Sequence, residues 1–161
     1  MIQGKIKCTN VFHKAYSSKT RITCLQGGTR SSKSYSLTQL FLVKCLEDTG
    51  KTYTICRKTL PALKGTAYRD FLEILKELDL YTEENHNKSE LSYLLNGNLI
   101  EFISIDQPTK IRGRKRNCLW LNEANEFTYE DWQQLILRTT EKIYLDYNPS
   151  DPYSWIYDKV I

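Results

Sequence analysis

Short apolar runs alternate along this chain with longer segments in which apolar residues recur every three or four positions. The short runs predict strands, and the longer segments predict helices with one buried face. Strands are expected at Arg21–Leu25, Tyr53–Cys56, Asn117–Leu121 and Lys142–Asp146. Helices are expected at Ser34–Asp48, from Pro61 to Leu78, and from the capping residue Thr128 to Arg138.

The second helical pattern contains Gly65, which costs about 1 kcal/mol relative to alanine, and we expect the helix to continue through it. Two further apolar runs, Leu91–Leu95 and Leu99–Ile105, flank the segment Asn96-Gly97-Asn98. Asn-Gly tolerates the positive φ angles of a tight turn, so this stretch predicts a β-hairpin. Strands that alternate with helices favour a mainly parallel sheet covered on both faces. The fold class predicted is therefore α/β, one unit over residues 1–161 with an inserted hairpin.

The composition of the chain excludes several classes of protein that it could otherwise belong to. The chain has 161 residues, is 40% hydrophobic, and carries 23 Lys and Arg against 19 Asp and Glu, which excludes a disordered chain. No apolar run approaches the ~20 residues of a membrane span, and the first residues lack the apolar stretch of a secretory signal. The five scattered cysteines form no CxxC pair, so we expect reduced thiols in a cytosolic protein.

A segment of small and polar residues separates the first predicted strand from the first helix. It consists of Gly27, Gly28, Thr29, Arg30, Ser31, Ser32, Lys33 and Ser34. In this setting small residues let successive backbone N–H groups point at phosphate oxygens, as in a P-loop that binds ATP. Lys33 would reach the β- and γ-phosphates, and the Ser34 hydroxyl would coordinate Mg²⁺. Ser32 stands where a P-loop has its second glycine, so an ordinary polar turn is the alternative.

Polar residues follow two of the other predicted strands. Asn122 and Glu123 come directly after the strand at 117–121. Glu123 would orient or deprotonate the attacking water, and Asn122 would support the metal where Asp is usual, with weaker Mg²⁺ affinity expected from an amide. Asn148, after the last strand, is placed to contact the γ-phosphate or its water. The alternatives are a solvated helix start, where acidic residues are favoured, and a plain Asn-Pro turn.

Five cations lie within the seven residues 110–116. Three interpretations of this basic run stay open. It can be a solvated loop, or it can contact nucleic-acid phosphates through Lys110, Arg114, Lys115 and Arg116. In the third interpretation Arg112, beside the flexible Gly113, reaches the γ-phosphate of a neighbouring subunit and stabilises the charge of the transition state.

Four segments together resemble the ATPase part of tailed-phage terminase large subunits, the motors that package DNA into proheads. They are GGTRSSKS, TICRKTLPALKGTAYRDF, IRGRKRNCLWLNEANEFTYEDW and YLDYNPSDPYSWIY, in the order of the family and over about residues 20 to 161. The resemblance implies a P-loop NTPase of the ASCE type, a three-layer sandwich that uses ATP and Mg²⁺. It also implies an enzyme that hydrolyses ATP to drive viral DNA packaging.

The resemblance also implies roles for individual residues. Lys33 and Ser34 fall on the phosphate and Mg²⁺ positions, and Glu123 falls on the catalytic glutamate. Arg112 or Arg114 falls on the segment that supplies an arginine in trans, and Asn148 on the motif that couples hydrolysis to DNA movement. Arg57 and Lys58 match a segment near the nucleotide.

The partners implied are double-stranded DNA, other copies of the chain in a ring, the portal and the small terminase subunit, with no membrane and a location in the host cytoplasm. Family members continue into an RNase H-like nuclease domain. This chain ends 13 residues after Asn148, so no nuclease activity is expected from it. The alternatives are a nucleotide- or DNA-binding module with little turnover, and a helicase-like P-loop ATPase of another family.

Overall fold

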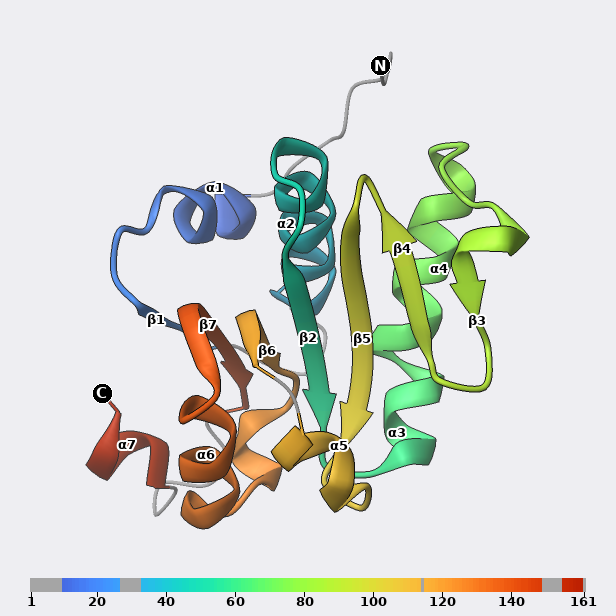
Figure 1. Ribbon diagram of the computed structural model, residues 1–161. Helices are drawn as coiled ribbons and strands as arrows, with labels where there is room; N and C mark the ends of the chain where they lie inside the picture. The colour runs from blue at the N-terminus through green and yellow to red at the C-terminus, as the bar shows by residue number, and fades with distance from the viewer. Residues whose placement is uncertain (1–9, 27–32, 114, 149–154, 161) are drawn as a thin grey trace.

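A seven-stranded sheet forms the centre of the protein (Figure 1). The computed structural model describes residues 10–26, 33–113, 115–148 and 155–160. The strand order is β1-β7-β6-β2-β5-β4-β3, in which β1, β7, β6, β2 and β5 pair in parallel and the last two pairings are antiparallel. The strands are β1 (Ile22–Gln26), β2 (Thr52–Arg57), β3 (His86–Asn87), β4 (Ser92–Leu95), β5 (Asn98–Ser104), β6 (Arg116–Leu121) and β7 (Thr139–Tyr147).

Helices cover both faces of this sheet, as expected. They are α1 (Asn10–Ser17), α2 (Lys33–Glu47), α3 (Leu60–Gly65), α4 (Ala67–Glu77), α5 (Pro108–Gly113), α6 (Tyr129–Ile136) and α7 (Trp155–Lys159), with two short 3₁₀ turns, η1 (Glu83–Asn85) and η2 (Ala124–Glu126). The buried residues of α1, α2, α3 and α4 share one hydrophobic cluster, and those of α5, α6 and α7 share a second. No helix in the described part of the chain is long and apolar enough to cross a membrane.

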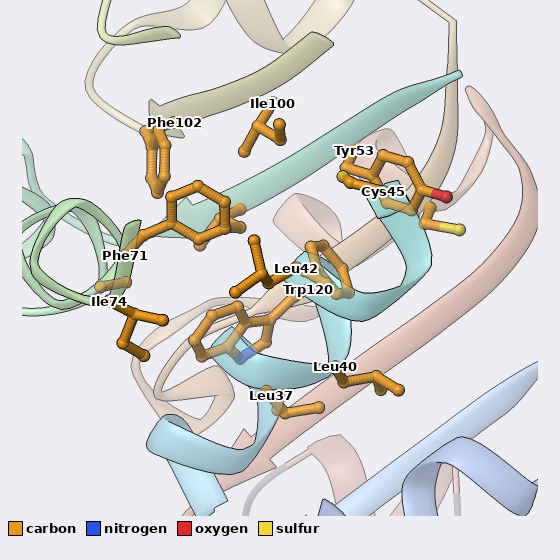
Figure 2. Packing of buried hydrophobic residues seen from close by; sticks show 14 of the residues in the cluster. Leu37, Leu40, Leu42, Cys45, Tyr53, Phe71, Ile74, Ile100, Phe102 and Trp120 are labelled. Carbon is orange, nitrogen blue, oxygen red and sulfur yellow. The ribbon is translucent and has the colours of Figure 1, made fainter. Parts of the chain in front are cut away.

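Alternation along the strands divides the core between these two layers. In β2, Ile55 belongs to the cluster under α2 and the next residue, Cys56, belongs to the cluster under α6. Figure 2 shows part of the first cluster around Trp120. Phe41 meets Trp120 edge to face, with ring centroids 5.9 Å apart. Phe71 and Phe102 extend the same packing towards the hairpin, with centroids 5.6 Å apart. These aromatic contacts hold α2 and α4 against the sheet.

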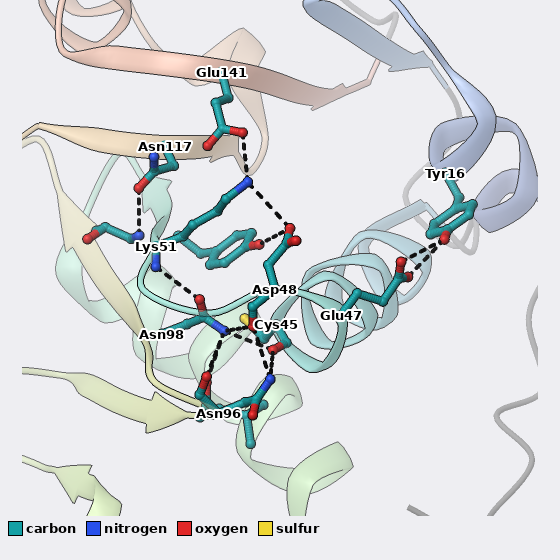
Figure 3. Close-up of polar contacts among 12 residues, drawn as sticks. Tyr16, Cys45, Glu47, Asp48, Lys51, Asn96, Asn98, Asn117 and Glu141 are labelled. Carbon is teal, nitrogen blue, oxygen red and sulfur yellow. Dashed lines mark hydrogen bonds and ion pairs between the residues drawn. The ribbon is translucent and has the colours of Figure 1, made fainter. Parts of the chain in front are cut away.

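A polar network fixes the amino ends of the central strands (Figure 3). The fully buried Asn98 accepts a hydrogen bond from the backbone N–H of Lys51 (3.0 Å) and donates to the carbonyls of Cys45 and Asp48 (both 2.8 Å). The Lys51 ammonium pairs with Glu141 at 2.8 Å, which ties β2 to β7 across β6. The network therefore sets the positions of α2, β2 and β5 relative to one another.

The predicted strands and hairpin are confirmed. Asn96 and Gly97 form the hairpin turn with φ angles of 53° and 77°. Thr128 caps α6 through a capping box with Asp131, also as expected. Helix α2 begins one residue before its predicted start, and β6 lies beside β7 as the Asn148 interpretation required.

The prediction of one continuous helix from Pro61 to Leu78 is wrong. The helix breaks at Thr66, whose φ and ψ of −129° and −94° are not helical. The Thr66 hydroxyl donates to the carbonyl of Ala62 (2.7 Å) and accepts from Arg57 (2.9 Å). A side chain that binds the preceding turn and a neighbouring strand competes with helix continuation, and Gly65 lowers the cost of the break.

Candidate functional site

The candidate site lies where the carboxyl ends of β6 and β7 meet the first turn of α2. In parallel α/β sheets, ligands bind outside the carboxyl ends of the strands. Ser34 is the second residue of α2, Asn122 and Glu123 follow β6 directly, and Asp146 lies near the end of β7. The alignment of Leu121 with Leu145 across the two strands brings these groups together.

Asn122 joins the helix to the two strands. Its Nδ2 donates to Ser34 Oγ (3.3 Å) and to Asp146 Oδ2 (3.0 Å), and its Oδ1 accepts a long bond from Arg57 Nη1 (3.5 Å). The residue is only 2% exposed, and its backbone N–H donates to the carbonyl of Cys56 on β2. The structure thus brings Ser34 and Asn122 together across 88 residues of sequence.

Asp146 is the site residue that sequence reasoning did not single out. It is fully buried, and its two carboxylate oxygens accept from Trp120 Nε1 (2.5 Å), Asn122 Nδ2 (3.0 Å) and the backbone N–H of Glu123 (3.0 Å). A signal for it exists in the sequence, because Asp146 is an acidic residue inside an otherwise apolar strand pattern. A buried charge of this kind requires dedicated partners.

Glu123 occupies a left-handed backbone conformation, with φ 55° and ψ 59°. For a residue with a Cβ this region costs roughly 1 kcal/mol or more, and such strain is concentrated at functional sites. The hydrogen bond from its backbone N–H to Asp146 holds the conformation. Glu123 is half-buried and directly follows the carboxyl end of β6.

Arg57, at the end of β2, brings a cation to the same edge. Its guanidinium contacts Glu126 (3.1 Å), Thr66 (2.9 Å) and Asn122 (3.5 Å). Lys58 points elsewhere and pairs with Asp131 at the start of α6 (3.0 Å). Of these two neighbours, only Arg57 contacts the polar cluster around Asn122.

Other predicted site residues are described in part or not at all. Gly27, Gly28, Thr29, Arg30, Ser31, Ser32 and Arg114 lie outside the described residues. Lys33 begins α2 and Arg112 lies in α5, and only their backbones are described. Because α5 packs with α6 on the face away from α2, the Arg112 backbone is not in the cluster around Asp146. The backbone N–H of Asn148 donates to Asn125 Oδ1 (3.2 Å), so Asn148 sits beside the segment that follows Glu123.

The basic run is not a uniform cationic surface. The expectation that Arg116 contacts nucleic acid is wrong, because Arg116 is 1% exposed and donates to the carbonyls of Leu135 (3.2 Å) and Ile111 (3.3 Å). Its burial lowers the pKa of the guanidinium. Lys110 pairs with Glu90 at 3.6 Å, whereas Lys115 is exposed. The run is also not a simple solvated loop, because Lys110 belongs to α5 and Arg116 to β6.

These groups suit an anionic ligand and a hard cation. The first turn of the 15-residue helix α2 directs its backbone N–H groups toward its amino end, an orientation that favours phosphate oxygens. Oxygen ligands, which Mg²⁺ prefers, are available from the Ser34 hydroxyl and from carboxylates. In the described part of the chain, no cluster of three or more His, Cys, Asp or Glu residues forms a ready-made metal cage.

Comparison with known proteins identifies a family that the chain matches. A family model described as phage terminase large subunit matches residues 19–161. No curated protein sequence matches the chain significantly. The large terminase of a thermophilic bacteriophage is similar in structure, with a TM-score of 0.81 and 15% identity over 96% of this chain and 42% of its own; that terminase has also been solved with ADP and with ATP-gamma-S.

Two further structures share the fold. The large terminase ATPase domain of Thermus phage P74-26 has a TM-score of 0.72 and 18% identity over 94% of this chain and 68% of its own. The viral genome packaging motor of bacteriophage Phi-29 has a TM-score of 0.60 and 14% identity over 92% of this chain and 50% of its own. The chain therefore spans less than half of the thermophilic-phage terminase. At these identities the likeness shows a common fold, which agrees with the mixed α/β architecture predicted from the sequence.

Proposed function

Because the chain belongs to the phage terminase large subunit family, we propose that it binds ATP at the carboxyl ends of β6 and β7 and hydrolyses it to drive viral DNA packaging into the prohead. Residues 1–161 would form one ATPase domain. The helicase-like alternative is not retained, because the family match covers residues 19–161.

One observation carries this proposal. The Ser34 hydroxyl in the first turn of α2 lies 3.3 Å from the Asn122 amide, and Glu123 follows Asn122 directly. The helix start suited to phosphate and the residue proposed to act on the attacking water therefore come together at one edge of the sheet, as hydrolysis of a bound γ-phosphate requires. An ordinary polar turn between β1 and α2 would not require this contact with a segment 88 residues further along the chain.

Each residue would act on a defined part of the reaction. Segment 27–32 and Lys33 would bind the phosphates, with Lys33 balancing the charge of the β- and γ-oxygens. Glu123 would orient the water and accept its proton, and Asn148 would contact the γ-phosphate or that water. Arg112 or Arg114 of a neighbouring copy would stabilise the negative charge that develops in the transition state.

Mg²⁺ fits the residues present. Ser34 would hold it through the hydroxyl, with Asn122 and the buried Asp146 behind, and a cation needs such negative charge nearby. When bound, it would neutralise charge on the phosphate oxygens.

Substitution of Lys33 tests the proposed activity. Lys33→Ala should lower steady-state ATP hydrolysis at least about 100-fold, since one charged group at the transferring phosphate is removed. The exposed Lys19→Ala serves as the matched control and should leave the rate unchanged. Phosphate release by Lys33→Ala as fast as that of the unsubstituted chain would overturn the proposal.

The proposed working state is a ring of copies on double-stranded DNA. The ring would be docked to the portal, aided by the small terminase subunit, and located in the host cytoplasm.

Within this assembly, Lys110, Arg114 and Lys115 would contact DNA phosphates. Changing Arg114 and Lys115 to Glu should flatten the dependence of log affinity on log salt by about 0.9 for each phosphate that is no longer neutralised. An unchanged slope would reject this role for the two residues.

A second candidate function is a nucleotide-binding module with little turnover. Asn122 favours it, because an amide carries no charge at a position where Asp is usual. This candidate predicts tight, Mg²⁺-dependent ATP binding without phosphate release even in the assembled motor, so the same assays separate the two functions.

A further inference from the structure

We propose that Asp146 supplies the cation site with the negative charge that the neutral side chain of Asn122 does not carry. The inference rests on the proposed function, since it concerns the same Mg²⁺-nucleotide site. The evidence is the set of hydrogen bonds around Asp146. Its buried carboxylate contacts Asn122 and the backbone of Glu123 directly, and the Asn122 amide in turn contacts Ser34.

The Asn122 amide presents its donor side to Ser34. Both Ser34 Oγ and Asp146 Oδ2 accept from Nδ2, and Oδ1 faces the Arg57 guanidinium. Reversing the amide would place its oxygen against the Asp146 carboxylate and its NH₂ group against a cation, and both contacts would be repulsive. Asp146 and Arg57 therefore fix the orientation of the amide.

An NH₂ group cannot coordinate a cation or accept a hydrogen bond from its bound water. Toward Ser34, then, Asn122 offers no ligand, in contrast to the expectation that it supports the metal itself. Asp146 lies 3.0 Å behind the amide and is fully buried, so its charge is weakly screened by solvent. The negative field of this buried carboxylate stabilises a divalent cation at Ser34 and offsets the amide N–H groups that face the same position.

Asp146 also positions the catalytic segment. Its Oδ1 accepts from the backbone N–H of Glu123, the residue held at φ 55°. The same carboxylate thus balances the cation and holds the backbone that carries the Glu123 carboxyl group. Asp146 is a positioning residue, since it acts through Asn122 and Glu123.

The test is the enhancement of nucleotide affinity by Mg²⁺, measured on the full chain by calorimetric titration with ATP-gamma-S in Mg²⁺ and in EDTA. Asp146→Asn should lower this enhancement at least tenfold and change the affinity in EDTA little. The double variant Asn122→Asp/Asp146→Asn keeps a hydrogen bond between the two side chains with donor and acceptor exchanged. It should recover most of the enhancement.

Trp120→Phe is the matched structural control, because it removes a hydrogen bond to Asp146 and leaves the charge. It should lower the melting temperature and preserve the enhancement. A folded Asp146→Asn with the original enhancement would overturn the inference. If Asp146→Asn does not fold, the double variant Asn122→Asp/Asp146→Asn provides the test. The inference would be overturned if that double variant does not fold, or if it folds and shows no enhancement of nucleotide affinity by Mg²⁺. Absence of nucleotide binding by the unsubstituted chain would instead contradict the proposed function.

Discussion

Asn98 illustrates how much a single buried side chain contributes to this fold. Its amide satisfies the N–H of Lys51 and the carbonyls of Cys45, Asp48 and Leu95, and none of its surface is exposed. Removal of this side chain takes the acceptor from the N–H of Lys51 and one donor from each carbonyl, although Asn96 Nδ2 still donates to the carbonyls of Cys45 and Asp48. A buried polar group left unsatisfied costs about 1–3 kcal/mol.

We expect Asn98→Ala to lower the free energy of unfolding by about 2 kcal/mol, measured by urea denaturation. The exposed Asn85→Ala, in η1, is the matched control and should change it by less than about 0.5 kcal/mol. A loss for Asn98→Ala no larger than that of the control would show that the network in Figure 3 does not stabilise the fold.

At the residue scale, the position of a residue could be predicted where it follows from local spacing. Ser34, Asn122 and Glu123 could be placed at one edge because each lies next to the end of a strand or the start of a helix. Asp146 and Arg116 could not be interpreted in this way. Whether a charged residue near a strand end faces solvent or the interior depends on the helices that cover it, and α5 and α6 bury Arg116.

At the element scale, local signals fixed α6 and the hairpin but not the break between α3 and α4. The capping box of α6 and the Asn-Gly turn are contained in a few consecutive residues. The break at Thr66 depends on Arg57, which comes from a different element and reaches Thr66 only in the folded protein. A periodic apolar pattern in the sequence contains no information about the contact between Arg57 and Thr66.

The capping box gives an element-scale prediction. Thr128 Oγ1 accepts from the backbone N–H of Asp131 (3.1 Å), and the Asp131 carboxylate accepts from the N–H of Thr128 (2.9 Å). Thr128→Ala should lower the free energy of unfolding by about 1 kcal/mol. Thr82→Ala, at the start of η1, where the side chain makes no capping bond, should cost less in the same urea titration. Equal losses would refute the contribution assigned to the cap.

The strands at the hairpin edge are expected to respond to pH through His86. Burial, followed by the positive charge of Lys88, lowers the pKa of His86 in the folded protein, and its ring nitrogens contact Tyr68 (2.5 Å) and Tyr81 (2.7 Å). The unfolded chain therefore binds a proton at His86 at pH values where the folded protein does not. The free energy of unfolding should fall as the pH drops below about 6.5, the ordinary pKa of histidine.

Urea titrations between pH 8 and pH 5 would reveal this dependence. In His86→Gln the titrating ring is absent, so the loss of stability on acidification should be smaller than in the unsubstituted chain. If the two proteins lose stability equally over this range, His86 is not the group responsible.

At the scale of the whole molecule, α5 contacts β5 and α6, and β5 is separated from β7 in the sheet by β2 and β6. Asp146 and its partners lie at the carboxyl ends of β6 and β7. Helix α5, which contains Arg112, lies past the carboxyl end of β5 (Figure 1), and its buried Ile111 packs in the cluster shared with α6. We propose that this segment supplies an arginine to a neighbouring copy, since α5 is not among the elements that provide Ser34, Asn122 and Asp146.

Under this arrangement, ATPase activity per chain should rise steeply with protein concentration, since an arginine supplied in trans is worth about 10³ or more in rate. In Arg112→Ala the rise should disappear while nucleotide affinity is retained. Activity that is independent of concentration over the range in which copies associate, followed by light scattering, would argue against a trans-acting arginine in this segment.

The central claim is that the carboxyl-end site hydrolyses ATP with Glu123 acting on the water. Its most direct test is phosphate release by Glu123→Gln at saturating Mg²⁺-ATP, beside the exposed control Glu130→Gln in α6. We predict that Glu123→Gln binds nucleotide normally and releases phosphate at least about 100-fold more slowly, because the proton acceptor is removed. Phosphate release by Glu123→Gln at the rate of the control would contradict the claim.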